Sequence, residues 1–281
     1  RSTAAPLTIL YTNDLHLRFE RLVSLERLIA DQREDAGPLL LLDAGDAWHD
    51  FRRPTTAVWG ADEMVSWMNR VGYDAMALGN HDLYWGPERL AELAERASFP
   101  LLCAVLRPIA GSRSPFASTA ILQAGGFSVY VVGLATSEYL AFSAFPWLRH
   151  VPPVEALRAE LARVPEDTDL VIVLAHLPVA DAVRIVEAVP GIDVFITGHS
   201  HEETPEPVLI GETVIVQSGM FARNLGRLDL DIDAGGRHRV IEHRLIPTEK
   251  APVDSSQGLR QLARVLVALS AILLLVFSSA R

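Results

Sequence analysis

Residues 7–16 read LTILYTNDLH, a largely apolar run that ends in a polar loop containing Asp14 and His16. The run has the length of a β-strand, and its continuous apolar character is typical of a strand that is covered on both faces. A strand followed at once by residues that can bind a metal ion is a pattern that returns further along the chain. This repeated pattern decides the fold prediction.

Four more strand-like runs, at residues 39–43, 74–78, 170–175 and 193–197, end in the same way. The polar residues that follow them are, in chain order, Asp46 in DAGD (43–46), Asn80, His81 and Asp82 in LGNHD (78–82), His176 after VIVLA (171–175), and His199 and His201 in GHSH (198–201). In open sheets of parallel strands, ligands bind just beyond the carboxyl ends of the strands. We therefore expect these loops to meet at one edge of a sheet.

Helical patterns lie between the strand-like runs, at residues 19–34, 55–71, 87–97, 154–164 and 179–188. Further strands are predicted at 101–105, in a hairpin over 119–123 and 127–134, and at 207–210, 213–217, 226–232 and 239–246. Alternating strands and helices predict a parallel sheet with helices on its faces, and the β-rich end of the chain is expected to add strands to a second sheet. The predicted fold class is α/β, a four-layer α/β/β/α sandwich of two mixed sheets flanked by helices, with a hydrophobic C-terminal helix.

The composition fits one large domain and disfavours a nucleic-acid partner. The chain has 281 residues, 49% of them hydrophobic, which allows a sizeable core. Its 25 basic and 35 acidic residues give a formal net charge of −10, and such a surface repels the phosphate backbone of nucleic acids. Small phosphorylated substrates remain compatible, because bound metal ions reverse the charge within a site. Cys103 is the only cysteine, so an internal disulfide and thiolate metal clusters are excluded.

The residues that follow the strands form a donor set suited to a pair of transition-metal ions. It comprises two carboxylates, one amide oxygen and four imidazoles, from Asp14, His16, Asp46, Asn80, His176, His199 and His201. Oxygen and nitrogen donors without a thiolate favour Mn, Fe, Zn or Co over Ca or Cu(I). Asp46 stands alone on its loop and is the candidate for a carboxylate that bridges both ions. Two ions about 3.5–4 Å apart can hold a hydroxide between them and bind the oxygens of a phosphoryl group.

The ordered series DLH, GD, GNHD, a lone histidine after a strand, and GHSH resembles the calcineurin-like metallophosphoesterase family, over roughly residues 7–246. YTNDLH, DAGD and VGLATSE (132–138) are similar to the family's 5′-nucleotidase branch. The resemblance implies one metal bound by Asp14, His16, Asp46 and His201, and a second bound by Asp46, Asn80, His176 and His199. It also implies a catalytic His81 beside the metals, which faces the phosphate, stabilises developing charge and protonates the leaving oxygen.

Two departures from the 5′-nucleotidase pattern bear on the substrate. The branch usually has an acid three positions after the histidine that matches His81, and here that position is Tyr84. Asp82 is the candidate substitute as a second catalytic residue, and its other interpretation is a loop-capping residue. Asn80, His81 and Tyr84 are the predicted substrate contacts. Full-length 5′-nucleotidases also carry a C-terminal domain that binds the nucleoside base through aromatic residues; we expect none here, so nucleotide specificity does not follow from the resemblance.

Several residues near the predicted loops have more than one interpretation. The aromatic residues beside the ligand loops have two interpretations: they form a platform for a substrate ring, or they pack and stiffen the loops. These residues are Trp48, Phe51, Tyr84 and Trp85. Residues 138–147 (EYLAFSAFPW) form either a lid over the site or a packed connection. Sharp turns behind the ligands are expected of Gly45, Gly79 and Gly198. Surface or satisfied histidines are expected at His49, His150, His238 and His243, and Cys103 is expected to be an inert core residue.

The last part of the chain differs in kind from the rest. Residues 1–249 are the predicted catalytic domain, 250–258 (KAPVDSSQG) a polar linker, and 259–281 a hydrophobic segment with no charge over 265–277. A membrane anchor is the first interpretation, with a lipid bilayer as partner, because Arg260 and Arg264 can snorkel and extend an apolar stretch shorter than a spanning helix needs. A lipid-anchor signal around Ser255 and Ser256 and a buried C-terminal helix are the others.

The leading functional hypothesis is hydrolysis of a phosphate ester, either a nucleotide or a related small phosphorylated compound, by attack of a metal-bound hydroxide. A phosphodiesterase acting on cyclic nucleotides or on nucleotide-linked lipid or sugar groups would use the same chemistry. A membrane-tethered binding protein without activity is the third hypothesis. The resemblance favours a membrane-associated domain outside the cytoplasm, whereas Arg260 and Arg264 are typical of a cytoplasmic one.

Overall fold

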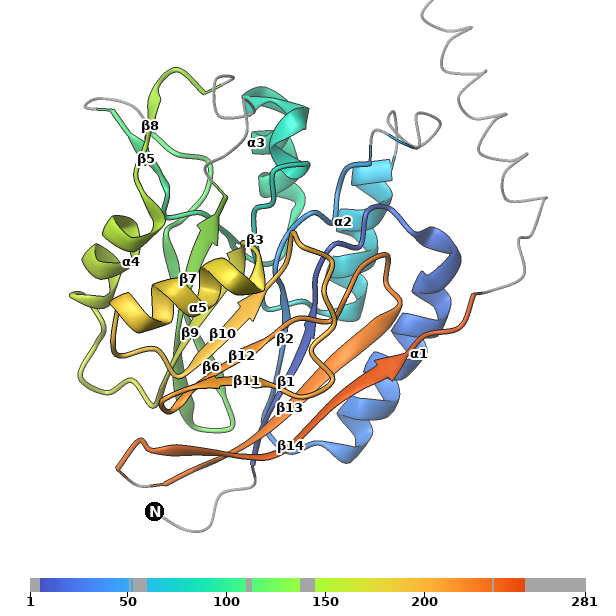
Figure 1. The fold of residues 1–281 in the computed structure, drawn as a ribbon. Coiled ribbons are helices and arrows are strands. Elements are labelled where there is room, and N and C mark those ends of the chain that lie inside the picture. Colours follow the sequence, from blue (N-terminus) through green and yellow to red (C-terminus); the bar gives the residue numbers. More distant parts are fainter. Residues whose placement is uncertain are drawn as a thin grey trace, which may run out of the picture. The chain divides into compact units, whose positions relative to one another are not determined.

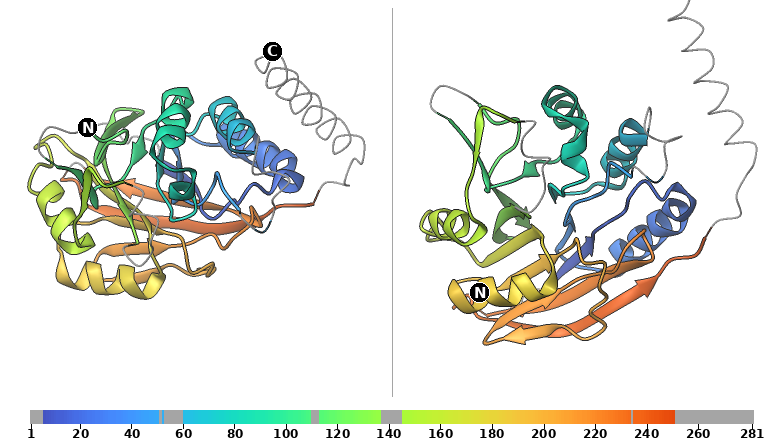
Figure 2. Two further views of the ribbon diagram at one scale, coloured as in Figure 1. Left: turned by 90° about the horizontal axis from the view of Figure 1, so that it is seen from above. Right: turned by 45° about the horizontal axis from the view of Figure 1, so that its top comes forward.

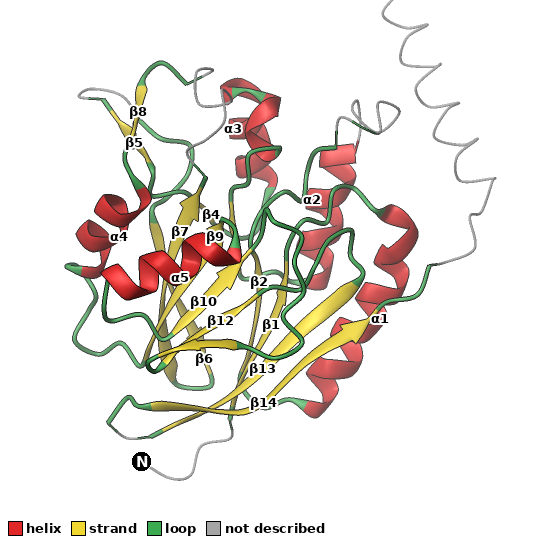
Figure 3. Cartoon of the chain, viewed as in Figure 1, coloured by secondary structure: helices red, strands yellow, loops and turns green. Residues whose placement is uncertain are grey.

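The computed structural model describes residues 6–50, 52, 60–109, 113–136, 145–233 and 235–250, and Figures 1 and 3 show how its elements are arranged. The helices in these ranges are α1 (Phe19–Asp35), α2 (Gly60–Val71), α3 (Pro87–Arg96), α4 (Pro153–Leu161) and α5 (Val179–Ala188), with a short 3₁₀ helix at Asp82–Trp85. The chain divides into two compact units, Arg1–Glu249 and Lys250–Arg281. All of the second unit except Lys250 lies outside the described residues.

The first sheet has six strands in the order β14-β13-β1-β2-β3-β4. Its parallel part consists of β1 (Leu7–Thr12), β2 (Leu39–Asp43), β3 (Ala75–Ala77) and β4 (Leu101–Leu102). β13 (Asn224–Ile232) pairs antiparallel with β1, so that Ile9 lies opposite Leu228, and β14 (His238–Pro247) forms the edge beyond it. Because β1, β2 and β3 are parallel neighbours, their carboxyl ends lie side by side.

The second sheet also has six strands, in the order β11-β12-β10-β9-β7-β6. Its parallel strands are β7 (Phe127–Ala135), β9 (Leu170–His176), β10 (Val194–Thr197) and β12 (Thr213–Val216). At the two edges β6 (Thr119–Ala124) and β11 (Val208–Ile210) pair antiparallel with their neighbours. A separate short pair joins β5 (Leu106–Pro108) to β8 (Leu148–His150).

The two sheets pack face to face and helices cover both outer sides, as Figure 2 shows from above. Successive side chains of a strand point to opposite faces of its sheet. Ile9 therefore joins the apolar cluster between the sheets together with Ile172 of β9, whereas Leu10 joins the outer cluster that contains Leu25 of α1. The described residues form a mixed α/β sandwich of two sheets flanked by helices, in agreement with the predicted fold class.

Local sequence accounts for the positions of the helices. α1 buries Leu22, Leu25 and Ile29, whose spacing of three and four residues places them on one face of a helix. α3 begins at Pro87, whose fixed φ and missing N–H suit the first position of a helix. The predicted helix over 55–71 is described from Gly60 onward, because residues 53–59 lie outside the described part.

One part of the sheet prediction is wrong. The sequence pattern predicts all of the C-terminal strands in the second sheet, which is correct for β11 and β12, but β13 and β14 belong to the first sheet beside β1. The alternation of apolar and polar residues identifies a strand and its buried face, but it does not identify the neighbouring strand. Pairing depends on contacts between residues that are more than 200 positions apart, such as Ile9 and Leu228.

The predicted linker and the hydrophobic helix at 259–281 lie outside the described residues, apart from Lys250. Within the described ranges, the structure contains no helix with the length and apolar character that crossing a membrane requires.

Candidate metal centre

The carboxyl ends of five strands bring the predicted ligands to one place. Asp14, Asp46 and Asn80 follow the adjacent strands β1, β2 and β3 of the first sheet. His176 ends β9 and His199 follows β10, which are adjacent in the second sheet. The backbone N–H of His199 donates to Oδ2 of Asp14 at 2.9 Å, which joins the two sheets at this point. The centre therefore lies across the ends of both sheets.

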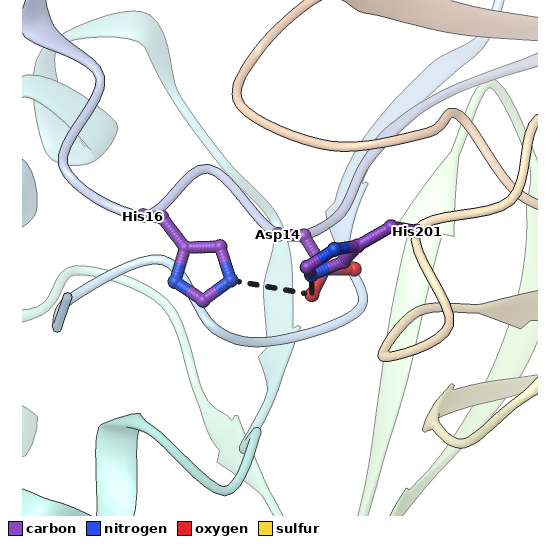
Figure 4. Close-up of side chains that lie close together, drawn as sticks. All are labelled: Asp14, His16 and His201. Carbon is purple, nitrogen blue, oxygen red and sulfur yellow. Dashed lines mark ion pairs between the residues drawn. The ribbon is translucent and has the colours of Figure 1, made fainter. Parts of the chain in front are cut away.

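Asp14 is surrounded by histidine nitrogens. Its Oδ1 lies 3.2 Å from Nε2 of His201, 3.5 Å from Nε2 of His16 and 3.9 Å from Nε2 of His176. Figure 4 shows the rings of His16 and His201 directed at this carboxylate from two different loops. The other oxygen, Oδ2, accepts the side-chain amide of Asn13 at 2.7 Å as well as the His199 N–H. One oxygen is thus fixed by the protein, and the other faces the imidazoles.

Asp46 has the same division between its two oxygens. Its Oδ1 accepts the backbone N–H of His81 at 2.8 Å. Its Oδ2 lies 3.1 Å from Nε2 of His176, 3.7 Å from Nε2 of His16 and 4.0 Å from Nε2 of His81. His16 and His176 each lie near both carboxylates, so Asp14 and Asp46 share one cluster. This central place is the one expected of a bridging carboxylate.

The remaining predicted ligands adjoin the cluster. Oδ1 of Asn80 lies 3.1 Å from Nδ1 of His199, and the His199 ring lies 5.1 Å from the ring of His176, centroid to centroid. The structure therefore brings together all seven residues that the sequence singles out as ligands. Groups of three that could hold an ion are Asp14 with His16 and His201, Asp14 with Asp46 and His176, and His16 with Asp46 and His81.

Two of the histidines are oriented by carbonyl groups behind them. Nδ1 of His176 bonds to the carbonyl of Ala44 at 2.8 Å, and Nδ1 of His16 bonds to the carbonyl of His49 at 3.0 Å. Donation from Nδ1 leaves Nε2 as the free lone pair, which is the tautomer of a metal-ligating histidine. Both Nε2 atoms and Oδ1 of Asp14 are buried without a hydrogen bond within the described residues. Three such atoms that face one another fit a bound cation.

The backbone of the ligand loops is held in an uncommon conformation. Positive φ angles occur at five predicted ligands, with values of 52° at Asp14, 47° at His16, 59° at Asp46, 73° at His199 and 62° at His201. A non-glycine residue in this region costs on the order of 1–3 kcal/mol, and such strain concentrates at functional sites. Hydrogen bonds between the loops hold it, since the N–H groups of Asp14 and His16 donate to the carbonyls of Gly45 and Asp46 at 2.9 Å.

The electrostatics of the cluster favour positive charge. Burial raises the pKa of the Asp14 and Asp46 carboxyls, but the neighbouring histidines, with His176 first among them, together outweigh it, and the net direction for both pKa values is downward. Burial likewise lowers the pKa of His176, but Asp46 and Asp14 outweigh it and raise that pKa to about 10. The two carboxylates thus stabilise a positive charge at this point, and a metal ion can supply it in place of the proton on His176.

A family model described as "Calcineurin-like phosphoesterase" matches residues 7–203, the segment that contains all seven predicted ligands. The chain belongs to the calcineurin-like phosphoesterase family. Membership confirms the predicted family and the predicted enzyme class, a metal-dependent phosphoesterase.

Curated relatives place this phosphoesterase in the 5′-nucleotidase-like branch. It is 32% identical over 276 residues to the 5′-nucleotidase of Bos taurus, which covers 82% of this chain and 47% of the relative. It is 26% identical over 235 residues to YunD of Bacillus subtilis (strain 168), an uncharacterized metallophosphoesterase, which covers 81% of this chain and 50% of the relative. The chain thus spans about half the length of these relatives.

Solved structures share the fold. The 5′-nucleotidase precursor from Thermus thermophilus is similar with a TM-score of 0.77 and 24% identity, over 94% of this chain and 59% of that one. The calcineurin-like phosphoesterase YfkN from Bacillus subtilis is similar with a TM-score of 0.73 and 19% identity, over 95% of this chain and 99% of that one. At these identities the likeness concerns the fold alone.

The glycines beside the ligands of this phosphoesterase serve mainly to make space. Gly45 has a φ of +94°, as a sharp turn requires, but Gly79 and Gly198 have no positive φ. A Cβ on Gly79 would lie 2.0 Å from Oδ1 of Asp46, and a Cβ on Gly198 would lie 2.9 Å from Nδ1 of His176. The positive φ of Gly45 fits the turn interpretation, whereas at Gly79 and Gly198 glycine is required by the space that the ligand side chains occupy.

Asp82 binds the backbone of the ligand loops. Its Oδ2 accepts the N–H groups of Asp46 at 2.8 Å and Gly79 at 2.9 Å, and its Oδ1 accepts that of Trp48 at 2.9 Å. Burial, with the nearby Asp46, raises the pKa of this carboxyl to about 7 against the effect of the three donors. The arrangement matches the loop-capping interpretation, and the catalytic role of Asp82 stays a prediction.

His81 lies at the more exposed edge of the cluster. Its ring is 4.8 Å from that of His16 and 5.5 Å from that of Tyr84, nearly perpendicular to both. Burial, together with the nearby His16 and His49, lowers the pKa of His81 to about 4 against the pull of Asp46. At neutral pH the ring is neutral, so it has one N–H to donate and no charge of its own.

Three residues beside the ligands were not singled out as part of the site from the sequence. Asn13 accepts the backbone N–H of Ser218 at 2.8 Å while it donates to Asp14, and its position directly before Asp14 is the only signal it offers. Phe221 lies 5.5 Å from the His16 ring, in a part of the chain with no motif. His49 lies 5.9 Å from His81 and its buried Nδ1 has no hydrogen bond within the described residues, so the surface or satisfied interpretation is wrong for it.

Other interpretations of single residues can be decided. Trp48 is fully buried and therefore packs, whereas Tyr84 is 47% exposed; Phe51 lies outside the described residues.

The histidines away from the site have the partners or exposure that the sequence predicts. His243 bonds to the hydroxyl of Tyr11 at 2.7 Å, His238 lies 3.2 Å from Asp193, and His150 is at the surface. Cys103 is buried in the core, where burial raises its pKa to about 12. Of the segment 138–147, only residues 145–147 are described, and Phe145 is fully buried.

Proposed function

We propose that this phosphoesterase hydrolyses the ester of a small phosphorylated compound, such as a nucleotide, with two divalent transition-metal ions. The observation that carries the proposal is the set of buried atoms that face one another without hydrogen bonds among the described residues, Asp14 Oδ1, His16 Nε2 and His176 Nε2. Family membership supports the reaction class, and the 5′-nucleotidase relatives favour a nucleotide.

The ligand assignment is the one that the family resemblance implies, and its first set includes the group formed by Asp14, His16 and His201. One ion would be held by Asp14, His16, Asp46 and His201, and the other by Asp46, Asn80, His176 and His199. Such ions, when bound, polarise phosphoryl oxygens and make a strong nucleophile available from water at neutral pH. The donor set of imidazole, carboxylate and amide groups suits Mn, Fe, Zn or Co.

The chain's own contribution is to hold the reacting groups in position. Oriented carboxylates and imidazoles are fixed by backbone groups before the substrate arrives, which removes the need for reorganisation during the reaction. His81 is neutral, lies beside Asp46 and has its Nε2 4.0 Å from the Asp46 carboxylate. From there its N–H can donate a hydrogen bond to an oxygen of the phosphate. The predicted transfer of a proton to the leaving oxygen requires the imidazolium form of His81, which the negative charge of a bound phosphate would favour. Asn80 can contact the same phosphate through its side-chain amide.

The test combines metal content with activity in one pair of variants. Wild-type protein should bind about two ions per chain and hydrolyse nucleoside monophosphates. Asp46→Asn should lose metal and at least about 100-fold in kcat/KM, because even groups that only support metal ligands cost 10- to 100-fold when changed. Asp181→Asn, a surface change on α5 where Asp181 pairs with Arg184, is the matched control and should behave as wild type.

Three results would contradict the proposal in different ways. Full activity of Asp46→Asn would exclude the metal mechanism. A preference for diesters such as cyclic nucleotides over monoesters would replace the substrate class with that of a phosphodiesterase. Wild-type protein that binds no metal and hydrolyses neither class in added Mn or Zn would indicate a binding protein without activity.

A further inference from the structure

Tyr84 is an exposed aromatic residue at the edge of the metal centre. Its side chain is 47% exposed, and its ring lies 5.5 Å from His81 and 5.7 Å from His49. Single exposed aromatic residues are common and need no function by themselves. Tyr84 differs from such residues in its position, because it adjoins His81, the histidine that is predicted to act on the leaving oxygen of the phosphate ester. Its hydroxyl makes no hydrogen bond within the described residues, so the ring is not held by a polar contact.

His49 forms the second part of this surface. Its ring lies 5.9 Å from that of His81 and 5.4 Å from that of Trp85, perpendicular to the latter. Its backbone carbonyl fixes His16, so the residue is anchored at the base of the centre. Its Nδ1 is buried and makes no hydrogen bond within the described residues. An unsatisfied buried polar atom is uncommon in a folded protein, and here it lies at the edge of the candidate metal centre. The partly exposed ring of His49, and not this atom, is what a ligand can contact.

The surface rests on a rigid support. The indole N–H of Trp85 donates to the carbonyl of Trp48 at 3.0 Å, and the backbone N–H of Trp48 donates to Asp82 at 2.9 Å. Asp82 in turn binds the N–H of Asp46, so the aromatic rings and the metal ligands share one set of loops. Binding surfaces held by packed side chains and hydrogen bonds lose little entropy when a ligand arrives.

The surroundings of Phe221, beside His16, have a different character. There the ring of Phe221 adjoins His16, and the guanidinium of Arg18 lies over it, 3.9 Å from its centroid. Arg52 lies 5.0 Å from the same centroid. A ring whose face is covered by a guanidinium is not open to a neutral aromatic group. Among the described residues, the rings of Tyr84 and His49 beside His81 have no guanidinium over them.

We propose that Tyr84 and His49 bind a planar aromatic ring in the alcohol portion of the substrate, next to His81. The proposal rests on the proposed phosphoesterase function and names its substrate class: phosphate esters whose alcohol carries a ring, such as the base of a nucleotide. A phosphate bound at the candidate metal centre beside Asn80, with its leaving oxygen at His81, would place the rest of the alcohol next to Tyr84, whose ring adjoins that of His81. Stacking on this surface adds affinity that a ringless phosphate ester lacks.

Adenosine monophosphate and ribose 5-phosphate test this, because both are primary phosphate esters and differ in the base. The full chain is assayed with added Mn, as wild type, Tyr84→Ala, Tyr84→Phe and His49→Ala. Stacking of a base on an aromatic side chain predicts that Tyr84→Ala lowers kcat/KM for adenosine monophosphate by roughly 10-fold, mainly through KM. The loss for ribose 5-phosphate should stay below about 2-fold, and Tyr84→Phe should restore the preference because it keeps the ring face.

A control and a binding measurement separate this proposal from the proposed function. Ile121→Ala, an exposed apolar change on β6, should leave both rates as in wild type. Saturation-transfer NMR should show adenosine binding to wild type and to Tyr84→Phe, with weaker binding to Tyr84→Ala and His49→Ala.

Each outcome decides one of the two proposals. Equal losses of Tyr84→Ala for both esters would make Tyr84 a positioning residue for His81 and overturn the binding surface, with the hydrolytic function intact. The binding surface would also be overturned if every variant kept the wild-type preference for adenosine monophosphate over ribose 5-phosphate. Adenosine binding that depends on Tyr84, in a protein that hydrolyses neither ester, would support the surface and overturn the hydrolytic function.

Discussion

Gly198 lies directly behind the ligands of the metal centre, in space that a methyl group would need. An added Cβ would lie 2.9 Å from Nδ1 of His176, 3.0 Å from the carbonyl of Ala44 and 3.1 Å from Oδ2 of Asp14. It would therefore disturb the hydrogen bond that orients His176. Gly198→Ala should destabilise the fold by about 1–3 kcal/mol, the usual cost of overpacking, and should also weaken metal binding. Isothermal titration with Mn and urea unfolding measure the two effects.

Gly211→Ala is the matched control for that change. Gly211 has a φ of +60° and open space around it, so alanine there meets backbone strain without a clash. It should cost about 1–2 kcal/mol of stability and leave metal affinity unchanged. If both glycine variants lost metal affinity equally, general destabilisation and not the displaced His176 would be the cause.

At the scale of residues, the sequence predicts those site residues that can be recognised by their type and by their position relative to a strand. Asp14 and His176 can be found because each is a metal-binding type directly at the end of a strand. His49 is missed because it follows no strand, and its contact with His81 exists only when two loops meet. The covered ring of Phe221 offers no signal, since neither its type nor its neighbours in sequence indicate a metal site.

At the scale of elements, Asp82 links the loop after β2 to the loop after β3. Asp82→Ala would leave the buried N–H groups of Asp46, Trp48 and Gly79 without their acceptor. Because an unsatisfied buried donor costs about 1–3 kcal/mol, the variant should lose at least about 3 kcal/mol of stability. Activity should fall with it, since Asp46 moves. Urea unfolding followed by circular dichroism measures the loss.

Asp169→Ala serves as the comparison for Asp82→Ala. Asp169 is also buried and accepts a backbone N–H, that of Ser128 at 2.9 Å, but it lies at the start of β9, away from the carboxyl ends of the strands. It should cost some stability and leave kcat/KM as in wild type. Equal losses of activity in the two variants would show that Asp82 has no special connection with the ligand loops.

At the scale of elements, sequence patterns predict where strands lie but not which strands pair. The runs of apolar residues locate the strands that carry ligands, and the meeting of their loops follows from the rule for parallel sheets. The partner of β13 cannot be predicted, because its alternating pattern fits any sheet with one buried face. Its place beside β1 depends on a register between residues at opposite ends of the domain.

At the scale of the whole molecule, residues 259–281 carry a prediction of their own. The uncharged stretch 265–277 is expected to partition into membranes, although it lies outside the described residues. In phase separation with Triton X-114, the full chain should enter the detergent phase, and a chain that ends at Lys250 should stay in the aqueous phase with its activity intact. Equal partition of both into water would exclude the anchor and the predicted membrane association.

The metal centre also connects the two halves of the sandwich. Asp14, Asp46 and Asn80 come from the first sheet, and His176 and His199 come from the second. Bound ions would therefore hold the sheets together at their carboxyl edge, and they would relieve the repulsion between two buried carboxylates. A ligand that binds only the folded state stabilises it by about 2.7 kcal/mol at 100 times its Kd.

For a domain of this size, that stabilisation corresponds to a rise in Tm of roughly 5–10 °C. Calorimetry of the full chain should show such a rise when Mn or Zn is added to metal-free protein, and its reversal by EDTA. The rise should be absent in Asp46→Asn and present in Asp181→Asn. A rise of the same size in Asp46→Asn would mean that the ions bind elsewhere, and the two sheets would then be held by their apolar cluster without help from the centre.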